Sequence, residues 1–439
     1  MPHTKRRRLV TTAVAVSLGA TTLAACGSSD SDSKTESGPV SLTYWTWTPG
    51  MDKVVDLWNK GPGKKDRITV TVKKQASGDS LVTKILTAHK AKKAPDLVQA
   101  EYQALPTLVS NGVVADIAGQ VGPAKGRFAA GTWNQVTLGT KSVYALPQDS
   151  GPMMLYYRAD LFTQLGLQVP KTWDEFAQTA RTVRAKAPKS YLTTFSSADA
   201  GWFAGLSQQA GARWWAISGD TWKVSINDAA TKKVADYWSG LVASGAVDKQ
   251  PMYTPAWNQA LNDGTLLAWP SAVWGPGVLA GNAASTQGKW AMAPLPQWSA
   301  GDQRTGSWGG SSTAISAKSK HRAEAARFAL WLNTDAQATA DLVTSGGIYP
   351  ADRDAQSGPA LQKPPAFFPQ QTDFYAQSKK IADTAAGFTW GPDVNVAYSA
   401  YNDAFAKAIT DGTSFSAAVD QMQQATVADM RKSGFKVSG

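Results

Sequence analysis

Residues 42–111 alternate between short apolar segments and longer segments whose apolar residues recur at helical spacing. Strands that alternate with helices in this way favour a parallel α/β sheet. In such sheets ligands bind beyond the carboxyl ends of the strands, so we expect the turns at 47–49 and 100–103 to lie at a ligand site. The pattern predicts strands at 42–47, 68–73 and 96–99, and helices at 51–60, 79–91 and about 103–111.

The chain begins with the layout of an export signal. Four basic residues at 5–8 precede an apolar run from Leu9. Leu23-Ala24-Ala25 then stand directly before Cys26, an ending that resembles a bacterial lipobox, in which the peptide is cut before the cysteine and the cysteine carries lipid. Cys26 is the only cysteine in the chain, so no internal disulfide accounts for it. A retained membrane anchor is the alternative, but the stretch is short for a span of about 20 residues.

We therefore expect residues 1–25 to be a lipoprotein signal peptide and Cys26 to be the lipidation site. Residues 27–38 carry no apolar side chain and cannot bury anything, which predicts a disordered tether over residues 26–39. The rest of the chain is expected to form a globular module at the outer face of the cytoplasmic membrane.

The composition is rich in tryptophan and poor in groups that carry out catalysis. The chain has 18 tryptophans but only three histidines, and its four glutamates are Glu36, Glu101, Glu175 and Glu324. The sequence suggests no phosphate loop, no Ser–His–Asp set and no histidine-rich metal site. The basic residues beyond the signal are dispersed, which argues against a nucleic-acid partner. We expect no cofactor and no bound metal.

Residues 144–176, which begin Tyr-Ala-Leu-Pro-Gln-Asp-Ser-Gly-Pro, resemble the signature of extracellular solute-binding proteins of the maltose-binding type. Further blocks match that family in order along nearly the whole chain beyond the signal. They are residues 94–98 with 111–112, 263–275, 309–315 with 323–332, and 345–350.

The resemblance implies an α/β fold of the type II periplasmic-binding-protein kind, in which two lobes clamp a ligand and are joined by crossing segments. The first lobe is then expected to hold residues 40–148 and 306–350, and the second residues 149–305 and 351–439. Each lobe would be discontinuous in sequence.

Tryptophan suits a sugar site because indole offers a large flat apolar surface to the C–H face of a pyranose ring. Trp47 ends the first strand, Trp202 lies in what reads as a polar turn, and Trp308 precedes a Gly-Gly pair. Trp390 stands in a Gly- and Pro-bounded aromatic loop. The resemblance aligns Trp274 with the tryptophan that stacks on sugar in family members. Packing in the core is the alternative role for each of these five.

The hydroxyl groups of a sugar need charged or amide partners, since hydrogen bonds to ionised groups are the stronger ones. Glu101, Gln103 and Asp149 lie in the two loops where the family places polar contacts. An exposed loop charge for Glu101 and a turn cap for Asp149 are the alternatives.

These features predict a monomeric, lipid-anchored binding protein, not an enzyme. It is expected to capture a carbohydrate, an oligosaccharide rather than a single sugar, and to deliver it to an ABC importer. The permease subunits and the ATPase of that importer must be separate chains.

Two other functions stay open. The same fold can bind a non-sugar solute such as a polyamine, a phosphoester or iron, although a cationic ligand would want more site carboxylates than Glu101 and Asp149. A secreted glycoside hydrolase would also use many tryptophans, but the scarcity of glutamate counts against the pair of carboxyl groups that it needs.

Overall fold

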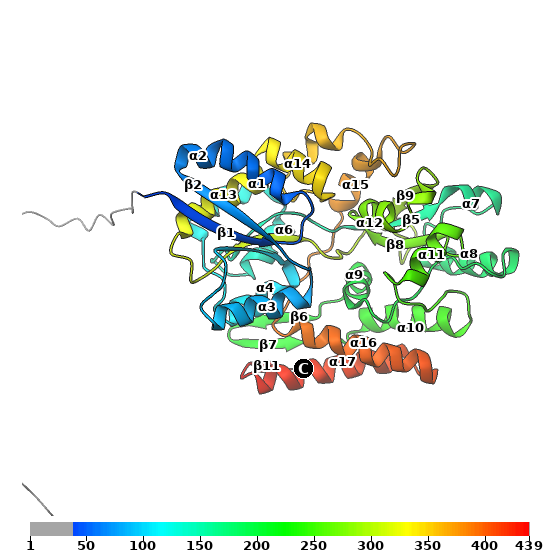
Figure 1. Ribbon diagram of the computed structural model, residues 1–439. Coiled ribbons are helices and arrows are strands. Elements are labelled where there is room, and N and C mark those ends of the chain that lie inside the picture. Colours follow the sequence, from blue (N-terminus) through cyan, green and yellow to red (C-terminus); the bar gives the residue numbers. More distant parts are fainter. Residues whose placement is uncertain (1–37, 439) are drawn as a thin grey trace, which may run out of the picture. The chain divides into compact units, whose positions relative to one another are not determined.

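Five strands form the first sheet of the computed structural model, which describes residues 38–438. They are β1 (Val40–Thr46), β2 (Ile68–Lys74), β3 (Leu97–Glu101), β4 (Ala145–Pro147) and β10 (Ser311–Ile315), in the order β2-β1-β3-β10-β4 (Figure 1). β1 pairs in parallel with β2 and β3, which confirms the predicted parallel pairing of the first three strands. β10 runs antiparallel to both of its neighbours, so the sheet as a whole is mixed.

Alternating burial explains the place of β1 in this sheet. Leu42, Tyr44 and Thr46 are buried, whereas Trp45 and Trp47 are half-buried on the opposite side of the strand. Side chains of a strand alternate between its two faces, so the two tryptophans share one face and only Trp47 reaches the carboxyl end.

The helices near this sheet bury apolar stripes. α1 (Met51–Lys60) buries Val54 and Trp58, and the Trp58 ring lies 5.4 Å from Phe328 and 5.3 Å from Trp331 between ring centroids. The other helices within residues 40–147 and 306–350 are α2 (Pro62–Asp66), α3 (Asp79–Lys90), η1 (Tyr102–Ala104), α4 (Leu105–Ser110), α5 (Ala118–Val121), η2 (Gly122–Arg127), α6 (Ala130–Thr137), α13 (Arg322–Thr334) and α14 (Ala336–Gly346).

The second sheet is antiparallel, with β5 (Met153–Arg158) between β8 (Ala268–Ala272) and β9 (Trp290–Pro294). β5 is buried along nearly its whole length, which matches its apolar sequence. A third sheet places β7 (Thr221–Val224) between β6 (Trp215–Ser218) and β11 (Lys436–Ser438).

Helices from two distant parts of the chain pack together with these two sheets, and we call this group of elements the second lobe. α16 (Val394–Asp411) packs along α17 (Phe415–Lys432), and these contact α9 (Ala200–Ala210) and α10 (Ala229–Ala243) (Figure 1). The remaining helices are α7 (Ala159–Gln164), α8 (Trp173–Lys186), α11 (Pro255–Asp263), α12 (Gly275–Asn282), η3 (Ala284–Thr286), η4 (Ala355–Ser357), η5 (Pro359–Leu361) and α15 (Phe374–Ala382).

Three segments pass between the first and second sheets and bond to one another. Segments 148–153 and 306–311 run antiparallel, joined by a backbone hydrogen bond of 2.8 Å from Trp308 to Gly151. Segment 349–351 bonds to the first of them through two further backbone hydrogen bonds. These are the crossing segments that the family resemblance implies. The lobe boundaries that the sequence places at them stay a prediction.

Glycine lets two of these segments approach each other closely. A Cβ atom on Gly151 would lie 2.2 Å from the carbonyl oxygen of Trp308. A Cβ atom on Gly306 would lie 1.9 Å from the carbonyl oxygen of Gly205 in α9. Any larger residue at Gly151 or Gly306 must therefore push the backbone away from the segment that it faces.

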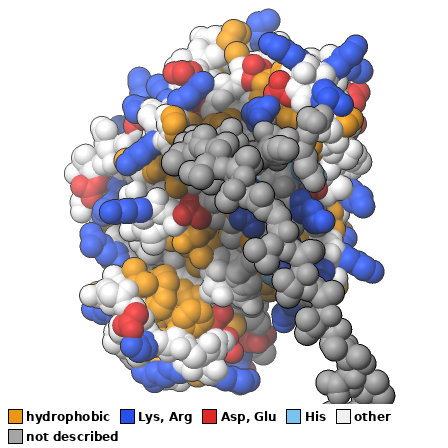
Figure 2. Space-filling view, turned by 90° about the vertical axis from the view of Figure 1, so that its left-hand side faces the viewer, with side chains coloured by type: hydrophobic (Ala, Val, Ile, Leu, Met, Phe, Trp, Pro, Cys, Tyr) orange, Lys and Arg blue, Asp and Glu red, His pale blue; other side chains and the backbone are white. Residues whose placement is uncertain are grey.

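Lys and Arg side chains are scattered over the face of the molecule that Figure 2 draws, with no continuous basic stripe on it. Within residues 38–438 every helix is too short or too polar to span a bilayer. The expected signal peptide at 1–25, the lipidation site Cys26 and most of the tether at 26–39 lie outside the described residues.

We predict that Gly151→Ala destabilises the protein by about 1–3 kcal/mol, the usual cost of overpacking a tight contact. Gly131→Ala is the control, since no atom lies within 4 Å of its added Cβ and Gly131 is in α6. Alanine there should be neutral or slightly stabilising. Thermal and urea denaturation measure the stability of both variants. Equal stabilities of the two would show that the segments at Gly151 and Trp308 can move apart without a cost in free energy.

Candidate ligand-binding cleft

Two adjoining cavities lie beyond the carboxyl ends of β1 and β3, as the sequence predicts. One has a volume of about 470 Å³ and the other about 280 Å³. Both are lined by Glu101, Asp199, Trp308 and Gly309, so they form one cleft. Residues of the first sheet, of the crossing segments and of the second lobe all contribute to its walls.

Six of the eight predicted ligand residues line this cleft. Trp47, Asp149 and Trp274 line the larger cavity and Gln103 lines the smaller one. Glu101 and Trp308 line both.

The buried amide of Gln99 holds the loop that carries Trp47. Its Oε1 accepts hydrogen bonds from the hydroxyls of Thr46 at 2.5 Å and Thr48 at 3.0 Å, and from the backbone N–H of Trp47 at 3.2 Å. Its Nε2 donates to the hydroxyl of Ser311 at 2.9 Å, in the crossing segment that leads into β10. The sequence does not indicate this role, because Gln99 is simply a polar residue within a predicted strand.

Asp149 lies where the crossing segments meet the cleft. Its carboxylate accepts a hydrogen bond from the backbone N–H of Ser311, and its carbonyl oxygen accepts one of 2.8 Å from the hydroxyl of Tyr102. Burial raises the pKa of Asp149 to about 6, while the hydrogen bonds from Ser311 act in the opposite direction. Asp149 therefore both fixes the crossing and faces the cavity.

The second lobe and a crossing segment together contribute an aromatic wall. The rings of Trp274 and Trp308 meet edge to face at 4.7 Å, and the indole N–H of Trp274 donates to the carbonyl oxygen of Trp308 at 2.9 Å. Buried Trp269 packs edge-on behind both rings. Tyr253 lies 6.4 Å from Trp308 between ring centroids and is 44% exposed. Because these rings support one another, their orientation is fixed before a ligand arrives.

Asp199 and Tyr253 are cleft residues that sequence reasoning misses. Asp199 directly precedes α9 and lines both cavities. Burial raises its pKa to about 7. In the sequence, only its position beside the aromatic residues around Trp202 indicates, weakly, that Asp199 lies at a ligand site. Tyr253 lies in a loop with a backbone φ of 63°, and no motif marks it.

Trp202 and Trp390 do not line the cleft. The prediction of a turn at Trp202 is wrong: it lies in the first turn of α9, is fully buried, and its indole N–H donates to the carbonyl oxygen of Pro270 at 2.9 Å. Trp390 is 8% exposed and packs 4.7 Å from Phe388. Its ring contacts Tyr398 edge-on, and it is Tyr398 that faces the cleft. Both tryptophans belong to the packing of the second lobe.

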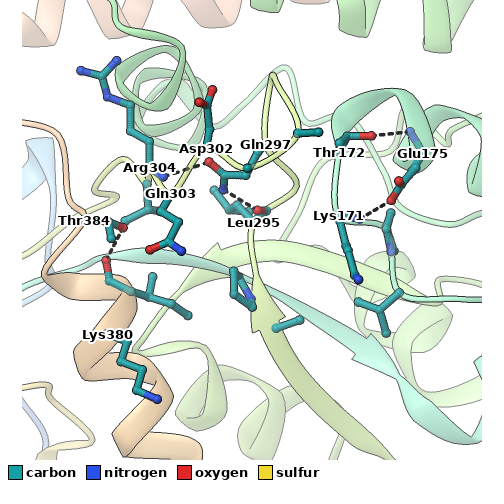
Figure 3. Close-up of a pocket in the computed structure, with 18 residues that line it drawn as sticks. Lys171, Thr172, Glu175, Leu295, Gln297, Asp302, Gln303, Arg304, Lys380 and Thr384 are labelled. Atoms are coloured by element: carbon teal, nitrogen blue, oxygen red, sulfur yellow. Dashed lines mark hydrogen bonds between the residues drawn. The ribbon is translucent and has the colours of Figure 1, made fainter.

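A separate cavity, of about 610 Å³, lies between the start of α8, the end of β9 and α15 (Figure 3). Its floor is apolar, and its rim carries Lys171, Glu175, Asp302, Arg304 and Lys380. Figure 3 shows Arg304 and Lys380 extending in opposite directions. Among the residues that the structure describes, no aromatic side chain lines this cavity. It therefore offers no stacking surface, and the cleft beyond β1 and β3 is the better candidate for the site.

No group of three His, Cys, Asp or Glu side chains that could hold a metal ion occurs within residues 38–438. The cleft instead combines aromatic faces with carboxylates and backbone groups. Such walls are suited to binding a polyhydroxylated ligand.

We predict that Asp199→Asn makes the stability of the protein less dependent on pH. The folded state keeps the Asp199 proton to about pH 7, whereas the unfolded chain loses it near the ordinary value of 3.8. The free energy of unfolding of the wild type therefore falls as pH rises from about 4 to about 7. The variant lacks this loss and should be more stable than the wild type at pH 8, by on the order of 2 kcal/mol, but equally stable at pH 4.

Thermal unfolding from pH 4 to pH 8 measures this difference. Asp302→Asn is the control because it removes an exposed carboxylate outside the cleft. It should leave the pH profile unchanged. Parallel profiles for wild type and Asp199→Asn would contradict the buried position of Asp199.

Several proteins that are similar to this chain are named for the sugars that they bind. The structure is similar to that of the galacto-N-biose-/lacto-N-biose I-binding protein of an ABC transporter from Bifidobacterium longum in complex with lacto-N-biose, with a TM-score of 0.81 and 28% identity over 92% of this chain and 100% of the other. The sequence is 22% identical over 357 residues to the arabinooligosaccharide-binding protein of Bacillus subtilis (strain 168), covering 78% of this chain and 80% of the relative. It is 27% identical over 236 residues to the lactose-binding protein of Rhizobium radiobacter, covering 52% and 55%.

These comparisons confirm the two-lobed α/β fold of type II periplasmic-binding proteins. The family model of bacterial extracellular solute-binding proteins matches residues 44–339, which include most of the cleft residues. By this match over most of its length, the chain belongs to the bacterial extracellular solute-binding proteins.

Proposed function

We propose that this protein captures an oligosaccharide outside the cell and delivers it to an ABC importer. The observation that carries the proposal is the cleft, whose walls combine Trp47, Trp274 and Trp308 with the carboxylates of Glu101 and Asp199. The relatives support it, because their names record lacto-N-biose, arabinooligosaccharide and lactose as ligands.

The walls match the two kinds of surface on a sugar. Indole and phenol rings can cover the C–H faces of the pyranose units, and carboxylates accept hydrogen bonds from the hydroxyls. The two cavities together are large enough to favour more than one sugar unit, since pockets of about 300–1,000 Å³ hold ligands of that size.

Transport would follow from closure of the lobes. A ligand that touches both lobes favours the closed form by its greater affinity for that form. The importer would recognise the closed, loaded protein. Its pore subunits and its ATPase are separate chains in this proposal, and the binding protein acts as a monomer that does not cleave its ligand.

The membrane link is proposed to be lipid on Cys26. The evidence is the basic and apolar signal, the lipobox-like ending and the absence of any other cysteine. Residues 26–39 would act as the tether between the lipid and the binding module at the outer face of the cytoplasmic membrane.

Ligand titration tests the proposal. The chain from Pro39 onward is a compact unit and can be used without the tether. Intrinsic fluorescence and thermal shift would follow additions of lactose, lacto-N-biose, arabinooligosaccharides, spermidine and glycerol 3-phosphate. Saturable binding of a saccharide with no product after prolonged incubation supports the proposal. Binding of only a non-sugar, or cleavage of a sugar, would overturn it.

We predict that Trp47→Ala weakens binding of the saccharide by about tenfold or more, which corresponds to about 1.4 kcal/mol or more. Trp45→Ala is the matched control: Trp45 is half-buried on the same face of β1 but does not line the cleft. Isothermal titration calorimetry measures both variants. Equal losses of affinity would assign the effect to the strand instead of the site.

We predict that Cys26→Ser releases the exported protein from the membrane. The wild type should stay in the membrane fraction and incorporate labelled fatty acid, because a thioether-linked lipid requires the cysteine sulfur. The variant should incorporate none. Ser28→Ala serves as the control, since it alters the tether and keeps the cysteine. Labelling of the Cys26→Ser protein would show that the anchor lies elsewhere.

A further inference from the structure

Two segments that are far apart in the sequence bring basic side chains to one end of the first sheet. Ile315, the last residue of β10, pairs with Leu97, the first residue of β3. The connection from α3 to β3 therefore meets the connection from β10 to α13. Six exposed Lys and Arg side chains occupy these connections and the adjoining helix ends, and we call them the basic cluster: Lys90, Lys92, Lys93, Lys318, Lys320 and Arg322.

Two hydrogen bonds hold the connections together. Lys318 Nζ donates to the carbonyl oxygen of His89 in the last turn of α3 at 3.3 Å. The hydroxyl of Ser319 donates to the carboxylate of Asp96, directly before β3, at 2.7 Å. The basic cluster is therefore one surface, although its members come from residues 90–93 and 318–322.

Carboxylates balance only part of this charge. Within residues 38–438 none of the six side chains forms an ion pair. The neighbouring segments carry three carboxylates, from Asp96, Asp116 and Glu324. Asp96 and Glu324 are half-buried, and Asp116 accepts hydrogen bonds from two backbone N–H groups. The basic cluster thus presents an excess of positive charge to the solvent.

The described chain begins at this same end of the sheet. β1 starts at Val40, beside the start of β2, at the left of the molecule in Figure 1. Figure 2 shows this side, on which Lys and Arg side chains are more frequent than Asp and Glu side chains. The proposed lipidation site, Cys26, lies 13 positions before Pro39. Such a length of chain spans at most about 45 Å, so a lipid on Cys26 would keep the basic cluster close to the membrane.

A lipid surface suits the basic cluster better than a nucleic acid does. Anionic headgroups attract Lys and Arg side chains that come near the membrane, and lipids can move sideways to reach separate charges. The phosphates of a nucleic acid have a fixed spacing and favour a continuous basic stripe. The side of the molecule in Figure 2 has no such stripe.

We infer that the basic cluster docks the binding module on the anionic phospholipid headgroups of the membrane that holds its anchor. The cleft lies beyond the carboxyl ends of β1 and β3, at the opposite end of the sheet. A module docked in this way keeps its cleft directed away from the lipid, toward the solution that supplies the ligand. The inference rests on the proposed lipid anchor for its setting, and adds to it an orientation for capture.

Vesicle binding tests the inference on the chain from Pro39 onward, which carries no lipid. The protein is sedimented with vesicles of phosphatidylcholine alone, and with vesicles of equal parts phosphatidylcholine and phosphatidylglycerol. We expect binding to the anionic vesicles only. Raising the salt from about 0.1 M to about 1 M should abolish it, because the screening length falls from about 10 Å to about 3 Å.

Two double variants with the same change in net charge locate the surface. Lys93→Glu with Lys320→Glu should weaken binding to the anionic vesicles by about tenfold or more, since it reverses two charges of the basic cluster. Lys189→Glu with Lys249→Glu is the control, at exposed loop positions after α8 and α10, and should leave binding nearly unchanged. Thermal unfolding verifies that both variants are folded.

Three results would overturn the inference. They are equal binding to vesicles of phosphatidylcholine alone, equal losses in the two double variants, and tighter binding to duplex DNA than to anionic vesicles at the same salt. Ligand titration of the same preparations keeps the proposed function separate. A module that binds a saccharide but no vesicles does not dock on lipid, whereas one that binds vesicles but no saccharide docks and lacks the proposed function.

Discussion

The insertion of β10 between β3 and β4 is the constraint on which the rest of the structure depends. The first sheet cannot be completed by residues 40–147 alone, since residues 311–315 supply the strand that bonds to both β3 and β4. Along the sequence, the chain passes through the second sheet before it returns to the first. This return brings Trp308 and Ser311 beside Asp149, so the segment that completes the sheet also lines the cleft.

Most of the first sheet could be predicted because its strands and helices carry clear periodicity. The strands β1, β2 and β3 lie within two residues of the predicted ranges, and both turns predicted at their carboxyl ends line the cleft. The antiparallel entry of β10 could not be read from local pattern, because it pairs residues about 200 positions apart. Only the family resemblance implied that the chain crosses between the lobes.

The errors at the site have a common physical cause. α9 is buried on nearly every side, so its sequence has no polar face to mark it as a helix, and the glycines around Trp202 resemble a turn. The abundance of tryptophan in the chain is also a poor guide to which residues contact a ligand. Several indole N–H groups are satisfied inside the protein, as those of Trp173 by Gln209 and Trp214 by Thr231. What distinguishes Trp47 and Trp274 is partial exposure at a strand end.

The single amide of Gln99 joins two parts of the protein that sequence places far apart. One end holds the loop of Trp47, and the other holds Ser311 in the crossing segment. A displacement of Ser311 would therefore act on the loop that carries Trp47 through the hydrogen bonds of this one amide. The free energy of a change at the crossing and that of a contact at Trp47 are then coupled through Gln99, and a substitution at this position alters both.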